Sequence, residues 1–118
     1  MKNIVLPLPP SVNALYGGGS KQRRFKTVAY KKWIKSCPEL PVLNINEPIE
    51  IFYGIYYPDK RNRDLSNYIK AVDDYLVNSQ VITDDCHTII TSFHVKFMGY
   101  DKKNPRIEIA IKKAPNGA

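Results

Sequence analysis

The sequence contains only two cysteines, Cys37 and Cys86, among its 118 residues. Two cysteines make neither a disulfide framework nor a zinc site, so a reducing cytoplasm is the expected location. No apolar run approaches the roughly 20 residues that a helix needs to span a bilayer. The N-terminus also lacks the long apolar segment that is typical of a signal peptide. We therefore expect a cytoplasmic protein without a membrane partner.

Acidic residues are scarce as well, because eleven Asp and Glu stand against eighteen Lys and Arg, which gives a net charge of +7. This excess favours a polyanionic partner, nucleic acid first and an anionic membrane surface second. A soluble protein that is basic without such a partner remains the alternative. The positive charge is concentrated at residues 21–35 and 60–63, and the second cluster adjoins acidic residues.

The length is that of one domain, residues 1–118, and is sufficient for a single hydrophobic core. Alternating apolar residues and β-branched runs predict strands, and 3.6-residue periodicity predicts helices. The predicted strands cover residues 2–8, 48–57, 87–98 and 106–112, the predicted helices cover 27–36 and 65–78, and 99–104 is a predicted hairpin connection. Apolar residues at both parities of 48–57 indicate a strand that is covered on both faces, by helices or by a second subunit. The expected fold is α/β (α+β): a mixed, mainly antiparallel sheet of about four strands packed by two helices.

Residues 17–26 are predicted to form a flexible loop, because they begin with Gly17-Gly18-Gly19-Ser20. Glycine-rich loops can bind phosphate, but this one lacks the Lys-Ser/Thr of a P-loop. Its second half is strongly basic, with Lys21, Arg23 and Arg24. We interpret it as a mobile arm that orders on a nucleic-acid backbone by charge neutralisation. Residues 115–118 are predicted to be a frayed tail.

The clearest helix lies behind Asp64, which is a good N-cap residue. The apolar residues of this helix recur at helical spacing and fall on one side. They are Leu65, Tyr68, Ile69, Val72 and Leu76. Asn67, Lys70 and Asp74 form a polar stripe along another side, with Asp64 at its leading end. Asp73 lies nearer the rear of the wheel and is expected to be solvated. The polar stripe is where we expect the chemistry.

Carboxylates in this region suggest a metal-dependent phosphodiester enzyme, since Mg²⁺ requires hard oxygen ligands that converge on one point. Asp64 precedes the helix, whereas Asp84 and Asp85 follow it. A helix of this length would place them at opposite ends unless the chain folds back. The alternative interpretations are a plain N-cap for Asp64 and a polar turn for Asp84 and Asp85. Lys70 is either a solvated helix residue or a group that stabilises charge developing at phosphorus.

Four segments in the same order resemble the RusA family of Holliday-junction resolvases. They are Pro9-Pro10-Ser11-Val12-Asn13, Ala29-Tyr30, the stretch from Pro58 to Asp74, and Val81-Ile82-Thr83-Asp84-Asp85. The resemblance implies an α/β homodimer, in a bacterial or phage-infected cell, that uses Mg²⁺ or Mn²⁺ and no small-molecule cofactor to cut four-way junction DNA on two strands. It implies that Asp64 and Asp85 bind the metal and that Lys70 is the catalytic lysine.

The same resemblance assigns a basic role at the site to Arg63, and Asp84 is a further candidate metal ligand. The expected DNA-binding residues are Asn13, Lys21, Arg23, Arg24, Lys60, Arg61, Arg63 and Asn67. Ser66 departs from the family's best-known members, which carry an aspartate at this position. A catalytically weak or inactive junction-binding protein is therefore an alternative. A duplex-binding regulator is a third hypothesis, but no helix-turn-helix pattern supports it, and acids on the exposed helix face do not suit phosphate binding without a cation.

Overall fold

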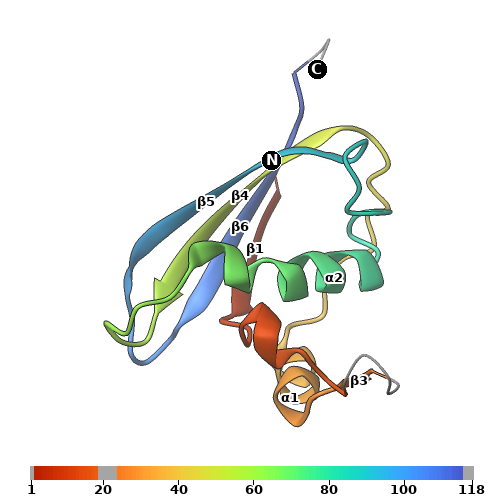
Figure 1. Cartoon of the computed structure of the whole chain (residues 1–118). Coiled ribbons are helices and arrows are strands. Elements are labelled where there is room, and N and C mark those ends of the chain that lie inside the picture. Colours follow the sequence, from red (N-terminus) through yellow and green to blue (C-terminus); the bar gives the residue numbers. More distant parts are fainter. Residues whose placement is uncertain (1, 19–23, 116–118) are drawn as a thin grey trace.

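The computed structural model describes residues 2–18 and 24–115. Its centre is a four-stranded mixed sheet in the order β1-β6-β4-β5 (Figure 1). The strands are β1 (Lys2–Pro7), β4 (Ile49–Tyr57), β5 (Ile90–Tyr100) and β6 (Arg106–Lys113). β6 pairs antiparallel with both β1 and β4, whereas β4 and β5 are parallel. The predicted α+β class and the mainly antiparallel sheet are confirmed.

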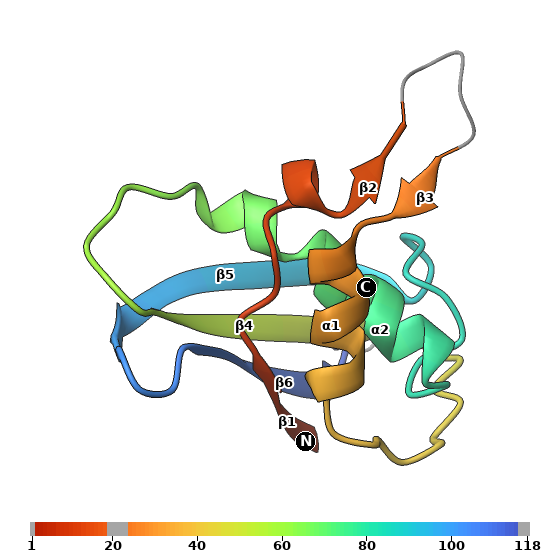
Figure 2. The same ribbon diagram turned by 90° about the horizontal axis from the view of Figure 1, so that it is seen from below.

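Two helices and four short elements complete the described chain. They are η1 (Val12–Ala14), β2 (Tyr16–Gly17), β3 (Phe25–Lys26), α1 (Val28–Ser36), η2 (Leu65–Tyr68) and α2 (Lys70–Asn78). β2 and β3 pair antiparallel in a small hairpin that projects beside η1 (Figure 2). The predicted loop 17–26 therefore begins and ends in strands, and Lys21 and Arg23 lie outside the described residues. No helix of the described residues is long and apolar enough to cross a membrane.

Alternation along β4 determines which face of the sheet is buried. Its odd-numbered residues from Ile49 to Tyr57 are all buried, and its even-numbered residues are only half-buried. β6 repeats this pattern, and both strands join one core with Trp33 of α1 and Leu76 of α2. Successive side chains of a strand point to opposite faces, so one face of the sheet packs against the helices. Within the described residues the helices cover one face of β4, and coverage of the other face by a second subunit stays a prediction.

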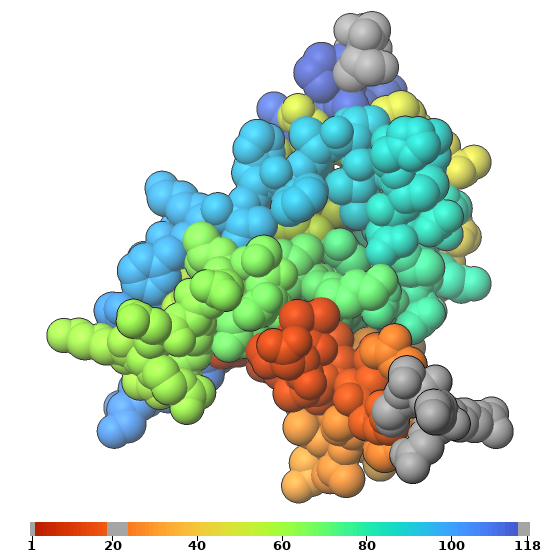
Figure 3. All heavy atoms as spheres, in the orientation of Figure 1, coloured from red at the N-terminus to blue at the C-terminus, as the bar shows by residue number. Residues whose placement is uncertain are grey.

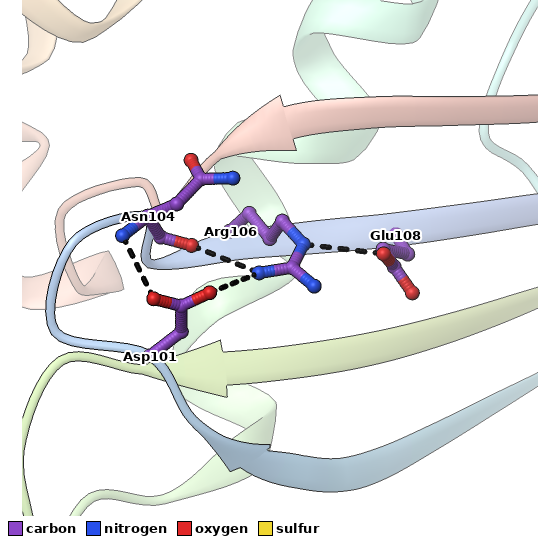
Figure 4. A network of polar contacts seen from close by, with 4 residues as sticks. All are labelled: Asp101, Asn104, Arg106 and Glu108. Carbon is purple, nitrogen blue, oxygen red and sulfur yellow. Dashed lines mark hydrogen bonds and ion pairs between the residues drawn. The ribbon is translucent and has the colours of Figure 1, made fainter.

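The prediction that residues 99–104 connect two neighbouring strands is wrong, because β4 lies between β5 and β6. The connection instead crosses the end of β4, where the backbone N–H of Asp101 donates to the carbonyl oxygen of Tyr57 at 2.8 Å. The Arg106 guanidinium then closes the turn by donating to Asp101 at 2.9 Å and to Glu108 at 3.1 Å (Figure 4). β6 alternates cleanly and occupies a central position, whereas the more exposed β5 forms one edge and β1 the other.

Helix α1 forms as the sequence predicts. Its first turn is capped by Thr27, whose hydroxyl oxygen accepts a hydrogen bond from the backbone N–H of Tyr30 at 3.2 Å. Trp33 is 5% exposed and is a core residue, as predicted. Its indole N–H donates to the carbonyl oxygen of Pro7 at 2.7 Å, which ties α1 to the end of β1. The helix ends before Pro38, which cannot continue it.

The second predicted helix is divided in two, because η2 precedes α2 and Ile69 joins them. Asp64 stands directly before η2, but its side chain makes no capping hydrogen bond. Its carbonyl oxygen instead accepts from the backbone N–H of Asn67 at 3.1 Å, the i+3 bond of a tight 3₁₀ turn. The expected side-chain cap is therefore wrong, and the Asp64 carboxylate is exposed at the start of the turn.

Candidate active site

The chain folds back after α2 and returns to the start of that helix. Gln80 adopts a positive φ of 61° and turns the chain, and Val81 and Ile82 are then buried beneath it. Ile82 forms a bridge with Ile45, and the backbone N–H of Thr83 donates to Ile45 at 3.0 Å. This return brings the next residues back towards the beginning of α2. The sequence alone did not show whether the chain folds back in this way.

As a result, Lys70 and Asp85 lie together although α2 and a turn separate them in sequence. The ammonium nitrogen Nζ of Lys70 is 3.9 Å from Oδ2 of Asp85 and 3.1 Å from Oδ1 of Asp74. Asp74 lies one helical turn after Lys70, so the polar stripe predicted from the sequence carries this ion pair. The hydrogen bond with Asp74 raises the pKa of Lys70 above its ordinary value. Lys70 is thus a charged group at neutral pH, half-exposed beside two carboxylates.

Asp73 was expected to be solvated, and this expectation is wrong. The Tyr53 hydroxyl donates a hydrogen bond to Oδ1 of Asp73, because Tyr53 points from the buried face of β4 towards α2. Burial raises the pKa of Asp73 from 3.8 to about 6, and the nearby Asp85 carboxylate acts in the same direction. A tyrosine at a buried strand position needs a hydrogen-bond partner for its hydroxyl. This requirement of Tyr53 was the signal in the sequence that a polar side chain of the helix could be drawn towards the core.

The raised pKa of Asp73 predicts a pH dependence of stability. Between pH 4 and 6 the folded chain holds a proton on this carboxyl that the unfolded chain has lost. The free energy of unfolding therefore falls as the pH rises through this window, by on the order of 2 kcal/mol. The Asp73→Asn variant lacks this pH-dependent part of the free energy of unfolding, because asparagine does not titrate. Urea denaturation of both proteins at pH 4, 5, 6 and 7 measures the difference, and parallel pH profiles would contradict the assignment.

Asp64 lies in a cleft of about 540 Å³ between η1 and η2. The cleft is polar, and its lining comes from two segments that are far apart in sequence. It is lined by Ser11, Arg61, Asn62, Arg63, Asp64, Asn67 and Tyr68. The space-filling view shows the residues of η1 directly against the 58–68 segment on one face of the molecule (Figure 3). The segment Pro9-Pro10-Ser11 thus contributes Ser11 to the cleft that also contains Asp64 and Asn67, two residues predicted to belong to the functional site.

Arg63 supports the loop that forms one wall of this cleft. Its side chain is 6% exposed, and its Nη2 lies 2.9 Å from Oδ1 of Asp59. Its Nη1 donates to the carbonyl oxygens of Asp59 and Arg61 at 3.2 and 3.1 Å. The guanidinium also lies 4.9 Å from the centre of the Tyr57 ring. Arg63 therefore fixes the loop conformation, whereas Arg61 is the exposed cation beside Asp64.

The predicted metal ligands are only partly brought together. Asp84 is exposed and accepts a hydrogen bond from the backbone N–H of Asp85 at 2.8 Å, which orders this turn. Across residues 2–18 and 24–115, no three His, Cys, Asp or Glu side chains form a group that could hold a metal ion. Asp64 lies in the cleft before η2, and Asp85 lies beside Lys70 at the start of α2. The predicted DNA-binding residues Asn13 and Lys60 are exposed.

Comparison with known proteins gives one consistent result. The sequence family described as endodeoxyribonuclease RusA matches residues 8–112. Proteins named crossover junction endodeoxyribonuclease RusA from Escherichia coli strain K12, from Escherichia coli O1:K1 and from Shigella sonnei strain Ss046 are each 30% identical to the chain over 118 residues. Each comparison covers 97% of this chain and 96% of the relative. The chain therefore belongs to the RusA family.

Proposed function

We propose that this protein is a structure-selective endonuclease that acts on DNA in the cytoplasm and resolves Holliday junctions by paired, symmetric phosphodiester cuts. The observation that carries the proposal is the fold-back that places Asp85 beside Lys70. A separate polar cleft holds Asp64 on the segment leading into the same helix. Family membership supports it independently, because the matching relatives are named as crossover junction endodeoxyribonucleases.

Asp64 and Asp85 would hold Mg²⁺, with Asp84 as a further ligand, and Mn²⁺ would substitute. The donor set fits, because carboxylate oxygens are the ligands that Mg²⁺ prefers, and one or two of them suffice when water and substrate phosphate fill the other positions. A bound Mg²⁺ supplies Lewis-acid polarisation of a phosphoryl oxygen and a more acidic bound water. Ser66 contributes no carboxylate to this set.

The remaining residues bind and position the DNA backbone. Lys70 is charged and half-exposed beside Asp85, where it would stabilise negative charge that develops on the phosphate. Further cations and amides of the chain would contact phosphates. These proposed contacts are Asn13, Arg24, Lys60, Arg61 and Asn67, together with Lys21 and Arg23 outside the described residues. Arg63 would act by holding the loop that presents Arg61 and Asp64.

We further propose a homodimer formed through the open face of the sheet. Among the aromatic residues of β4, Tyr53 and Tyr57 belong to the core, which leaves Phe52 and Tyr56 on the open face. That face has an apolar depression of about 500 Å³, where Val5 and Met98 are 51% and 44% exposed. A two-fold symmetric junction requires two matched cuts, and an isologous dimer supplies two identical sites about a matching axis.

The dimer is tested by sedimentation at micromolar concentration. We expect a species of twice the 13.5 kDa chain mass, and we expect Met98→Glu to convert it to the monomer, because a charge would be buried in the apolar interface. Phe93→Glu is the matched control, since Phe93 lies on the opposite face of β5 and is also exposed, at 59%. A wild-type species near 13.5 kDa that is unchanged by junction DNA would exclude the dimer.

A junction-binding protein that does not cut is the second candidate. The serine at position 66 favours it, as does the lack of a three-residue ligand group within the described part of the chain. The deciding experiment incubates a synthetic four-way junction and a linear duplex of the same sequence with the protein. Binding is measured in EDTA, and strand cleavage is measured after Mg²⁺ or Mn²⁺ is added. We expect selective binding and symmetric cuts, whereas binding without cuts in either metal would establish the second candidate.

A further inference from the structure

The β2–β3 hairpin presents an aromatic ring in an unusual setting. Phe25 is 59% exposed, and its ring lies directly on the backbone of Gly17. A Cβ atom added at Gly17 would stand only 2.5 Å from Cζ of Phe25, so the close approach depends on glycine. The ring thus has backbone behind it and solvent in front of it. This is the arrangement of a flat support rather than of a side chain that packs into a core.

Cations flank this ring on both sides in sequence, and each of them is held over a different aromatic ring. The guanidinium carbon of Arg24 lies 4.7 Å from the centre of the Tyr16 ring. The ammonium of Lys26 lies 5.8 Å from the centre of the Tyr30 ring. These contacts hold the charged groups beside Phe25 instead of over it. Phe25 therefore remains accessible between two groups that attract phosphate.

The hairpin is firmly attached to the element that carries Lys70. At its base, the Thr27 hydroxyl donates to the carbonyl oxygen of Ala14 at 2.6 Å. A series of aromatic contacts then runs from the hairpin through α1 to α2. The ring centres are 5.7 Å apart for Tyr16–Tyr30, 6.2 Å for Tyr30–Trp33 and 5.8 Å for Trp33–Tyr75. Packing of this kind fixes the position of the hairpin relative to α2.

We propose that Phe25 stacks on an unstacked nucleobase of the DNA substrate while Arg24 and Lys26 contact the adjoining phosphates. Every nucleobase has a π-face, so an exposed aromatic ring with neighbouring cations binds unpaired bases without sequence preference. Strands exchange at the branch point of a four-way junction and continuous stacking is interrupted there, so a base pair at this point can open and expose the face of a base to the ring. The proposal rests on the proposed function, because it takes junction DNA as the substrate.

The test uses a four-way junction that carries 2-aminopurine next to the branch point, bound in EDTA so that no strand is cut. We expect the wild-type protein to change the 2-aminopurine fluorescence on binding. Phe25→Ala should weaken the affinity about 10-fold and abolish the fluorescence change, as is typical when one stacking aromatic is lost. Phe25→Leu should behave like Phe25→Ala, because leucine keeps an apolar side chain but has no π-face. Val42→Ala is the control, since Val42 is also 59% exposed but lies in the loop before β4.

The salt dependence of binding distinguishes two causes of a lower affinity in Phe25→Ala: loss of stacking by the ring, and disruption of the hairpin that also removes the ionic contacts. If only the ring is lost, Phe25→Ala keeps the slope of log K against log salt concentration, because Arg24 and Lys26 still contact phosphate. A reduced slope would attribute the loss to ionic contacts and would overturn the proposal. Unchanged affinity in Phe25→Ala, or full affinity in Phe25→Leu, would overturn it as well. A wild-type protein that does not bind the junction would overturn the proposed function too, so the two failures are distinguishable.

Discussion

Replacement of Asp64 or Asp85 by asparagine is expected to abolish junction cleavage in Mg²⁺ while junction affinity stays unchanged or rises. Each change removes a ligand charge that the metal needs and, at the same time, reduces electrostatic repulsion between the site and the phosphate backbone. Loss of a direct ligand should reduce the cleavage rate by more than about 100-fold, since even loss of an outer-shell partner costs 10- to 100-fold.

Cleavage and binding must be measured separately for these variants, on the same four-way junction, with binding in EDTA. Glu47→Gln provides a matched control, because Glu47 is an exposed acid that pairs with Lys113 at 3.7 Å and is not one of the candidate ligands. The control should cut and bind like the wild type. Normal turnover by either aspartate variant would remove that residue from the metal site. Weakened binding without metal would instead give the residue a role in the DNA interface.

Asp74→Asn is expected to slow cleavage by acting through Lys70. The ammonium of Lys70 has Asp74 as its nearer partner, at 3.1 Å, and this bond fixes it beside Asp85. Lys70→Ala removes the charge itself and should lower kcat about 100-fold, as is usual for a group that stabilises transition-state charge. Asp74→Asn leaves the charge on Lys70 but no longer holds the ammonium in place. We therefore expect about a 10-fold fall in kcat, which is the range seen when a residue that orients a functional group is lost.

A double-mutant cycle distinguishes this positioning role from general damage to α2. If Asp74 acts only through Lys70, the double variant is no slower than Lys70→Ala, because no further interaction remains to be lost. KM should change little, and Asp74→Glu should recover part of kcat, since glutamate also reaches a lysine one turn away. Additive losses in the double variant, or no rescue by glutamate, would show that Asp74 contributes by another route.

Local signals in the sequence predicted most elements of the fold. The β-branched and aromatic run of 48–57 became β4, the alternation of 106–112 became β6, and Thr27 capped α1. Two members of the predicted polar stripe, Lys70 and Asp74, lie together on α2, whereas the third, Asn67, belongs to η2. These predictions succeeded because they depend on residues that are neighbours along one strand or one helix.

Predictions that depend on distant segments were less successful. Two strands with suitable patterns and a short connection suggested a hairpin, but β4 competes for the same edge of β6 and lies between them. The solvated position assigned to Asp73 was wrong because helical periodicity does not include the Tyr53 hydroxyl that reaches it from the sheet. The approach of Asp85 to Lys70 depends on the turn at Gln80 and on the pairing of Ile82 with Ile45, and neither is visible in local sequence.

The position of β6 between β1 and β4 has a consequence for synthesis of the protein. β6 is made last among the strands, yet it is the sole link in the four-stranded sheet between the first strand and the rest. Until it leaves the ribosome, β1 has no partner strand, and β4 has only the parallel edge strand β5. Sheets held by such long-range pairing form slowly, and incomplete ones expose unpaired edges that aggregate. The nascent chain should therefore assemble its sheet only after β6 has emerged.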